Sequence, residues 1–378
     1  MGWRAVLIFD PDRDPAVRLA GLSLAGRAAA EAVAAGASDI VLVGAWLFEA
    51  GLEPELARIC ADIPFSFAAI GEPIREPAIR IRCDRYIARS AVLRRFAEGG
   101  SARLMCGDAV VAERDGLGAE AADPADLLDL ERPAAAARRI LAATAKASDG
   151  IVSRRLNRPI SQRISAQLLK IAAIRPWHLT VATASITLLM FASFLQAGRI
   201  GLIFGGILFH VASVMDGIDG EIARATFRAS ERGAVLDTTV DMATNLLFYL
   251  GVTVSLSRLY GPVHLFVGGW CLMLAVIGLL LIRVLAERAG DPGSFDILKV
   301  HYRARFPDGA MARLAAFTVA ITSRDFFAFG NALIILSGWG MLVTWLLAGF
   351  ATLWLILILA AAPAILRLPP ARAAFRDI

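Results

Sequence analysis

The chain has 378 residues, of which 57% are hydrophobic and 19% are charged, and its mean hydropathy is +0.61. A composition this apolar excludes an ordinary soluble protein and requires segments that cross a bilayer. The net charge of +5 does not indicate nucleic-acid binding, because the arginines of the second half stand in short segments between apolar runs, as in cytoplasmic loops of membrane proteins.

Charge and hydropathy divide the chain near residue 148. Residues 1–148 hold 18 Lys+Arg and 21 Asp+Glu, and residues 149–378 hold 21 and 13. The stretches long enough to cross a bilayer lie in the second part. The start, MGWRAVLIFDPDRD, has too short an apolar run for a signal peptide or a span, so we expect residues 1–148 to form a cytoplasmic domain.

Strand-like and helical segments alternate through the first 120 residues. A helical stretch covers Ser23–Ala35, and such alternation predicts an α/β domain with a parallel sheet. The expected strands are Ala5–Phe9, Ile40–Val43, Ile79–Cys83 and Ala109–Val111. Residues 121–149, rich in Ala, Asp and Arg, are typical of a linker that passes into a helix.

An amphipathic segment follows the linker at Ile151–Ile174. It mixes five basic residues with Ile and Leu at helical spacing, so it is too polar to span. We expect a helix along the cytoplasmic surface, with its cations near anionic head groups.

The rest of residues 149–378 predicts six transmembrane helices. A tight turn near Gly349 is expected between the last two, which are nearly continuous. The expected spans are 179–197, 200–223, 234–257, 263–286, 327–348 and 350–367.

Positive charges favour one orientation of these spans. Loops 224–233 and 287–326 and the C-terminal tail are rich in Arg and Lys, whereas the opposite loops offer only Arg199 and Arg258. The sequence therefore predicts a polytopic protein of the cytoplasmic (inner) membrane with these loops in the cytoplasm.

Four carboxylates stand at or inside the membrane boundary: Asp216, Asp219, Asp237 and Asp241. An acid within a membrane costs about 2.5–3.5 kcal/mol even on the lenient insertion scale, so the group needs a compensating ligand. Asp216 and Asp219 share one helix face, and Asp237 and Asp241 share a face of the next helix, so the two pairs can face each other.

A hard divalent cation would keep converging carboxylates ionised, and Mg²⁺ or Mn²⁺ is favoured because no Cys or His stands in the cluster. Small residues beside the acids leave room for a ligand, and Arg224 lies at the basic end, which favours a phosphate. The competing interpretation is that the acids cap helices or pair with Arg224, Arg228 and Arg232.

The spacing of these residues resembles, at every position, the signature of the CDP-alcohol phosphotransferase family, D-x2-D-G-x2-A-R-x8-G-x3-D-x3-D. The similarity covers about residues 150–370, with the surface helix and six spans of that family. The signature positions are Asp216, Asp219, Gly220, Ala223, Arg224, Gly233, Asp237 and Asp241.

The resemblance implies transfer of a phospho-alcohol group from a CDP-linked donor to a lipid or polyol hydroxyl, with release of CMP. It implies a homodimer with a site for two metal ions. Asp216, Asp219 and Asp237 would bind metal and the donor diphosphate, and Asp241 would be a ligand and the general base. Gly220, Ala223 and Gly233 would make space for the CDP moiety, beside Arg224.

One departure precedes the first span, where the family commonly has T-P-N and this chain has Arg175, Pro176, Trp177 and His178. We expect this difference to bear on the choice of acceptor more than on the chemistry.

Residues 5–44 weakly resemble the opening of sugar-phosphate nucleotidyltransferases. This resemblance implies an alternative function, that of a bifunctional chain that makes its own CDP-alcohol and uses it to form a phosphodiester of inositol-phosphate type. The phosphate loop of those enzymes is G-x-G-x-R with a later Lys-Pro, whereas Asp10 to Arg18 holds no glycine. Asp84 would match a metal ligand there, although it also suits a turn. We expect a degenerate domain with a structural or regulatory role.

Two other classes of function compete with the enzyme. A polytopic transporter or channel would place acids near the bilayer midplane in an inverted repeat, whereas these four lie at one boundary. A degenerate scaffolding module is disfavoured by the intact signature.

Overall fold

The computed structural model describes residues 2–44, 51–61, 63–75, 77–146, 149–196, 198–289, 297–306, 308–310, 313, 317 and 324–367. The chain forms two compact units. Unit 1 comprises Met1–Ala145, Gln162–Arg175 and Gly220–Ala229, and unit 2 comprises Lys146–Ser161, Pro176–Asp219 and Ser230–Ile378.

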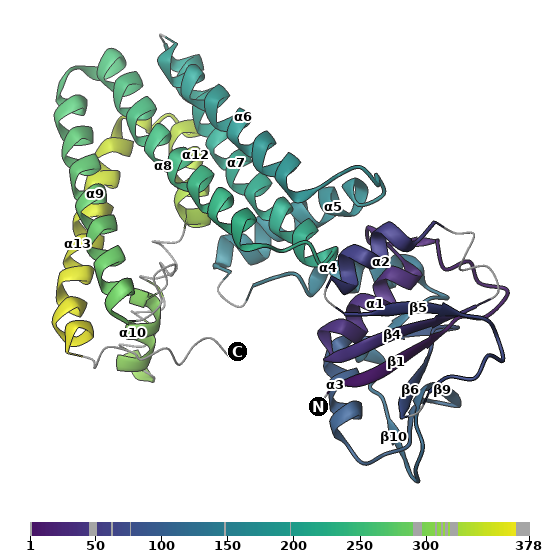
Figure 1. Cartoon of the computed structure of the whole chain (residues 1–378). Coiled ribbons are helices and arrows are strands. Elements are labelled where there is room, and N and C mark those ends of the chain that lie inside the picture. Colours follow the sequence, from purple (N-terminus) through teal and green to yellow (C-terminus); the bar gives the residue numbers. More distant parts are fainter. Residues whose placement is uncertain are drawn as a thin grey trace. The chain divides into compact units, whose positions relative to one another are not determined.

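Unit 1 contains a seven-stranded sheet in the order β10-β8-β9-β6-β1-β4-β5 (Figure 1). Its strands β1, β4, β5 and β6 are parallel, while β9 runs antiparallel to β6 and β8. The bounds are β1 Trp3–Ile8, β4 Ala37–Val43, β5 Phe65–Ala68, β6 Ala78–Arg82, β8 Arg103–Cys106, β9 Ala109–Glu113 and β10 Ala119–Ala121. The four predicted strands are thus confirmed, in a mixed rather than purely parallel sheet.

The centre of this sheet is apolar on both faces. Ala5, Val6 and Leu7 of β1 are fully buried, and Val6 is in register with Val41 of β4. Continuous apolar runs of this kind are typical of parallel strands covered on both faces. Two-stranded sheets pair β2 (Arg18–Leu19) with β3 (Leu22–Ser23), and β7 (Tyr86–Ala88) with β11 (Leu127–Asp129).

Four α-helices lie within the described part of residues 1–145 in unit 1. The first begins at Ser23, whose side chain accepts a hydrogen bond from the backbone N–H of Gly26 and caps the helix. This helix confirms the one predicted at Ser23–Ala35. The helices are α1 Leu24–Ala34, α2 Glu53–Cys60, α3 Ser90–Glu98 and α4 Pro133–Ala142, with a short 3₁₀ helix η1 at Pro124–Asp126.

The amphipathic segment is helical, as predicted. It begins with a π-helical stretch, η2 (Ser153–Asn157), and continues as α5 (Arg158–Leu168). Short π-helical turns within an α-helix often occur at functional sites.

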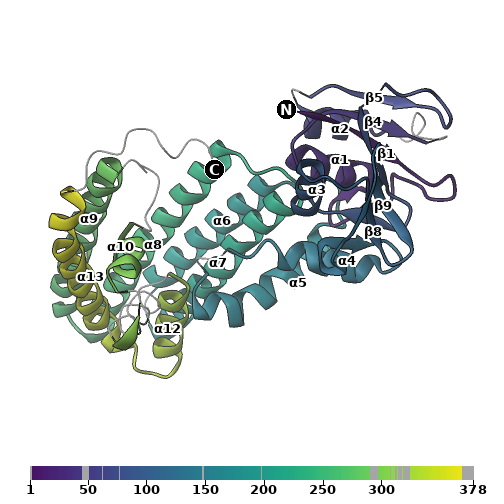
Figure 2. The same ribbon diagram turned by 90° about the horizontal axis from the view of Figure 1, so that it is seen from below.

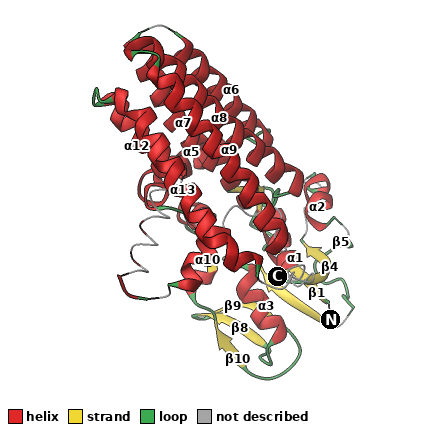
Figure 3. Cartoon of the chain, turned by 90° about the vertical axis from the view of Figure 1, so that its left-hand side faces the viewer, coloured by secondary structure: helices red, strands yellow, loops and turns green. Residues whose placement is uncertain are grey.

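Five helices of the described chain are long and apolar enough to cross a membrane. Within unit 2, α6 packs on α8, α8 on α9 and α9 on α13 (Figure 2). These helices are α6 Pro176–Leu195, α7 Arg199–Ala225, α8 Glu231–Tyr260, α9 Val263–Ala289 and α13 Val343–Leu366. Figure 3 shows the contrast between the helical C-terminal part and the strands, which all belong to unit 1.

The end of the helical part differs from the prediction. Helix α12 (Arg324–Leu336) has 13 residues, and α13 runs unbroken past Gly349, where a turn was expected. The break lies instead at Gly338, whose φ of +86 favours glycine. The predicted turn at Gly349 is therefore wrong, and the count of six spans is not confirmed.

Part of the predicted cytoplasmic loop at 287–326 forms α10 (Ile297–Arg305). Residues 290–296, most of 307–323 and the tail 368–378 lie outside the described residues, and with them part of the charge pattern used for orientation.

Small residues bring the helices of unit 2 into contact. The stacked rings of Phe209 and Phe248 lie 3.8 Å apart between centroids, and Phe194 meets Phe248 edge to face. A Cβ at Gly205 or Gly251 would lie 2.5 or 2.9 Å from the Phe194 ring. Such close approach is typical of helices packed within membranes.

Candidate active site

Three of the four predicted carboxylates meet in unit 2. Asp216 of α7 and Asp237 and Asp241 of α8 each offer an oxygen, and these oxygens lie within 4.8 Å of one another. All three side chains are half-buried. The convergence follows from the helical spacing, because Asp237 and Asp241 are four residues apart and so lie on one face of α8.

Asp219, the fourth carboxylate, stands one turn after Asp216 on α7 and is 4% exposed. Thr180 of α6 donates a hydrogen bond from Oγ1 to its Oδ2 at 2.8 Å. The sequence prediction missed Thr180. The signal available was a hydroxyl in the first turns of the span that follows the divergent Arg175–His178 stretch.

An ion pair in unit 2 supports α7 between these two aspartates. Arg158 donates from Nε and Nη2 to the two carboxylate oxygens of Asp149 at 2.8 and 3.1 Å, and from Nη1 to the carbonyl of Gly217 at 3.4 Å. A Cβ at Gly217 would lie 3.4 Å from Arg158 Nη1. Burial raises the pKa of Asp149, but the hydrogen bond and charge of Arg158 outweigh it and leave the pKa below its usual range.

The end of α7 belongs to unit 1 and carries three further signature residues, which are half-buried: Gly220, Ala223 and Arg224. Arg224 donates from Nε to the carbonyl of Thr144 at 2.8 Å, and a Cβ at Gly220 would lie 3.0 Å from its Nη1. Within unit 1, therefore, the missing side chain of Gly220 leaves room for the Arg224 guanidinium.

Helix α8 begins just before Gly233. Ser230 is the N-cap, and its Oγ accepts from the backbone N–H of Gly233 at 3.1 Å. Gly233 is exposed, and a Cβ there would lie 3.1 Å from the same Oγ. The cap sets the start of the helix and thereby the phase at which Asp237 and Asp241 face the cluster.

The donor set fits a hard divalent cation. Carboxylate oxygens from three residues converge, and no His or Cys belongs to the group that these residues form. Oxygen ligands of this kind suit Mg²⁺ or Mn²⁺.

Three further hydrogen bonds, to two acidic side chains, were not predicted. Glu221, fully buried in unit 1, accepts a 2.6 Å hydrogen bond from Ser165 of α5. In unit 2, Asp325 of α12 accepts from Asn157 at 3.0 Å and from Ser213 at 3.1 Å. Each contact joins residues more than 50 positions apart, which no local pattern reveals.

The N-terminal sheet brings Asp84 close to Asp10, at the carboxyl ends of β6 and β1. Burial raises the pKa of Asp84 first, and the Asp10 charge raises it further, while Arg82 and Arg13 oppose the shift. Ligands of open α/β sheets bind at this edge.

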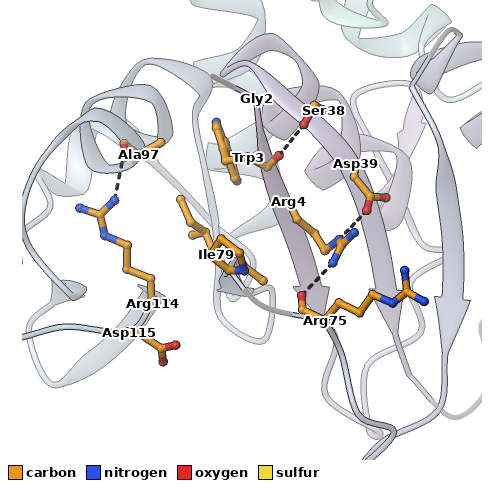
Figure 4. A pocket seen from close by; sticks show the side chains of 12 residues that line it. Gly2, Trp3, Arg4, Ser38, Asp39, Arg75, Ile79, Ala97, Arg114 and Asp115 are labelled. Atoms are coloured by element: carbon orange, nitrogen blue, oxygen red, sulfur yellow. Dashed lines mark hydrogen bonds and ion pairs between the residues drawn. The ribbon is translucent and has the colours of Figure 1, made fainter.

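A pocket of about 500 Å³ opens at the opposite edge of this sheet (Figure 4). Two of its three arginines are engaged by the protein itself: Arg4 pairs with Asp39, and Arg114 donates to the carbonyls of Ser101 and Ala97 at 3.0 and 3.1 Å. Because these two donors are occupied and no signature residue lines the pocket, it is not the candidate active site.

Comparison with known proteins gives a match to the family model described as CDP-alcohol phosphatidyltransferase, over residues 173–362. All eight signature residues lie in this range.

Curated relatives carry related names. The chain is 34% identical over 154 residues to a bifunctional IPC transferase and DIPP synthase of Thermococcus kodakarensis, which is 40% of this chain and 33% of the relative. It is 36% identical over 112 residues to a protein of the same name from Archaeoglobus fulgidus, 29% of this chain and 22% of that one.

An archaetidylinositol phosphate synthase of Pyrococcus horikoshii is 33% identical over 91 residues, 24% of this chain and 46% of the relative. The matched regions thus span less than half the length of each of these three relatives.

Proposed function

Because the chain belongs to the CDP-alcohol phosphatidyltransferase family, we propose that it transfers a phospho-alcohol group from a CDP-linked donor to a hydroxyl acceptor, with release of CMP. The observation that carries the proposal is the convergence of the Asp216, Asp237 and Asp241 oxygens within 4.8 Å at signature positions. Five helices among the described residues are long and apolar enough to place the reaction in a membrane.

The reaction needs a proton acceptor and a way to hold a diphosphate. The acceptor oxygen forms a bond to the donor phosphorus while its proton passes to Asp241, and the phosphorus–oxygen bond to CMP breaks. Mg²⁺ or Mn²⁺, two ions in the proposal, would supply positive charge to both the attacking and the departing oxygens. Asp216, Asp219 and Asp237 would hold these ions, and Thr180 orients Asp219 through its hydroxyl.

The donor diphosphate would lie along the last turns of α7. In the proposal Gly220, Ala223 and Gly233 leave space for it, and Arg224 contributes a guanidinium, the group best matched to phosphate geometry. The acceptor is proposed to be a lipid or polyol hydroxyl, with the phosphodiester of inositol-phosphate type as the alternative that the names of the relatives support.

The charge and hydropathy of the sequence support a location and an orientation for the protein. We propose a cytoplasmic domain over residues 1–148 and a membrane domain over 149–378, with the site facing the cytoplasm and the protein acting as a homodimer. Support comes from the position of the carboxylates near one end of α7 and α8 and from the basic residues that follow α7.

A second candidate function is cytidylyl transfer by the N-terminal domain. The observation in its favour is the proximity of Asp10 and Asp84 at the carboxyl edge of the sheet. The glycine-free segment Asp10 to Arg18 speaks against it, since a phosphate loop relies on glycine for close backbone approach. We expect no pyrophosphate release from CTP and a polyol phosphate, and release would reinstate the bifunctional alternative.

The test of the main proposal is CMP release from a panel of CDP-alcohols by the purified protein in lipid nanodiscs. Release should require Mg²⁺ or Mn²⁺ and stop with a chelator. Asp237→Asn should lower it to less than about a tenth, because an amide lacks the charge that holds a hard cation.

Glu231→Gln is the matched control, since it neutralises an exposed acid in the first turn of the same helix and should leave turnover unchanged. If no donor yields CMP with folded wild-type protein, the proposal fails. Equal activity of Asp237→Asn and Glu231→Gln would overturn the assignment of the ligands.

A further inference from the structure

Four arginines from separate segments gather in unit 1, and we call them the arginine cluster: Arg18, Arg58, Arg175 and Arg228. Arg58 lies on α2, Arg175 directly precedes α6, and Arg228 is the third residue after α7. None of them is a signature residue of the proposed active site.

The chain around Arg228 is held in an unusual turn. Phe227 has a φ of +51, a conformation that favours glycine and is strained for a bulky side chain. Backbone bonds from Arg228 to the Ala223 carbonyl at 2.8 Å and from Phe227 to that of Arg224 at 3.4 Å form a Schellman cap with Phe227 in the place where glycine is usual.

Two arginines of the N-terminal segment support this turn. The guanidinium of Arg27 lies 5.6 Å from the centre of the Phe227 ring and donates to the carbonyl of Ala225 at 2.6 Å. Arg58 donates from Nη1 to the carbonyl of Phe227 at 3.2 Å. The strained residue therefore brings Arg58 next to Arg228.

A further hydrogen bond brings Arg175 into the arginine cluster. Arg228 donates from Nη1 to the carbonyl of Ile174 at 3.3 Å, which brings it beside Arg175. Burial lowers the pKa of both Arg58 and Arg228, and the positive charge of Arg175 lowers both further. Like charges have thus been drawn together and partly removed from water, an arrangement that is unfavourable without a counter-charge.

Glu55, the acid beside these arginines, supplies only part of the negative charge that would neutralise them. Glu55 opposes the pKa shifts of Arg58 and Arg228, but it also accepts from the backbone N–H and Oγ of Ser23 at 2.9 and 2.7 Å and pairs with Arg18 at 3.7 Å. Buried N–H groups at Arg58 Nη2 and Arg228 Nε have no hydrogen-bond partner among the residues that the structure describes. Donors of this kind are expected to meet an acceptor.

We propose that Arg58, Arg175 and Arg228, flanked by Arg18, bind a phosphate group at the surface of the membrane. Guanidinium groups match phosphate geometry and form strong charge-assisted hydrogen bonds with it. Because Arg175 and Arg228 stand at the ends of two apolar helices, the site lies where those helices leave the bilayer, at the level of the head groups.

Two sources could supply this phosphate, an anionic lipid head group or a soluble phosphate compound, and two arms of one experiment distinguish them. In the first, the full chain in detergent is titrated with inorganic phosphate, and binding is followed by thermal stability. In the second, native mass spectrometry measures how much phosphatidylglycerol the chain retains from mixed vesicles of phosphatidylcholine and phosphatidylglycerol. Neither readout requires turnover, so the outcome is independent of the proposed reaction.

The variants are Arg58→Gln, Arg228→Gln and Arg175→Gln, each assayed singly. Arg175 is exposed, so its variant tests the site even if the half-buried Arg58 and Arg228 variants fold poorly. Arg138→Gln is the matched control, because Arg138 is an exposed arginine of unit 1 that, among the described residues, bonds only to the Ala134 carbonyl of its own helix α4. Each cluster variant should weaken the affinity about tenfold relative to this control.

Weakening in the phosphate arm alone would identify a soluble ligand, and weakening in the lipid arm alone would identify a head group. Either result, or both, supports the site. If Arg175→Gln matches the wild-type chain in both arms, or if Arg138→Gln loses as much as the cluster variants, the proposal is overturned and the arginines serve only to hold the turn.

Discussion

At the scale of single residues, the candidate active site brings like charges close together. Asp216, Asp237 and Asp241 would repel if left alone within 4.8 Å, and a divalent cation relieves that repulsion. Asp219 differs from them, because Thr180 already donates a hydrogen bond to it. The four carboxylates are therefore expected to differ in function although all four belong to one signature.

The roles of metal ligand and general base can be told apart by a substitution at Asp241. Asp241→Asn should depress CMP release far more than donor affinity, because three carboxylates remain to hold metal while the proton acceptor is lost. Calorimetric binding of the CDP donor, measured beside turnover, separates the two. Equal losses in both would make Asp241 chiefly a ligand, and unchanged turnover would remove it from the mechanism.

A pH effect is expected from Asp149 and Arg158, whose side chains are only 9% and 10% exposed. The native pKa of Asp149 is lowered, so its contribution to stability is complete above the ordinary carboxyl pKa of about 3.9 and disappears as pH falls through the native value. Thermal unfolding in detergent, followed from about pH 5 to about pH 3, should show this loss. Asp149→Asn should be less stable at the upper end and show a smaller change, and parallel curves for the two proteins would contradict the assignment.

At the scale of elements, small residues determine how closely the helices of unit 2 pack. Gly268 of α9 faces α8, and a Cβ there would lie 2.2 Å from Thr253 Oγ1. Its neighbour Gly269 has open space instead. Adjacent positions of one helix are thus under opposite constraints, because only one of them faces another helix.

This contrast gives a matched pair of variants. Gly268→Leu should force α8 and α9 apart and lower the yield of folded protein, whereas Gly269→Leu should be tolerated. Size-exclusion profiles and melting temperatures in detergent provide the comparison. Similar behaviour of the two variants would show that the α8–α9 contact is not a determinant of folding.

At the scale of the whole molecule, the N-terminal residues contribute to unit 1 together with the end of α7. Arg27 is 1% exposed, burial lowers its pKa to about 10, and it donates to the carbonyls of Ala20 and Ala225 at 3.0 and 2.6 Å. Glu221 and Thr226 are also buried there. Residues 1–145 therefore support the end of α7, which carries three of the eight signature residues.

Deletion of residues 1–145 should accordingly lower both the melting temperature and CMP release, since it removes the donors to Ala225 and Phe227 and the Thr144 carbonyl that holds Arg224. Arg27→Met in the full chain should produce a smaller change in the same direction. A truncated chain with full stability and turnover would show that the domain is dispensable for the membrane reaction.

The sequence by itself determined the features that depend on local periodicity. Alternating runs gave the strands β1, β4, β6 and β9 and helix α1, and helical spacing placed Asp216, Asp237 and Asp241 on faces able to meet. Hydropathy predicted spans close to the observed bounds of α6, α7, α8 and α9, because burial in lipid requires a long uninterrupted apolar run.

Only the tertiary structure decided which distant residues meet. Thr180 reaches Asp219, Arg158 supports Gly217, and Arg58 reaches the strained turn at Phe227 across 169 positions of sequence. The position of the helix break, at Gly338 rather than Gly349, was also decided only by the tertiary structure. Both glycines permit a turn, and an apolar run does not show which of them forms it. Such contacts depend on how helices pack and on which polar groups remain to be satisfied after packing, and neither is encoded in a local pattern.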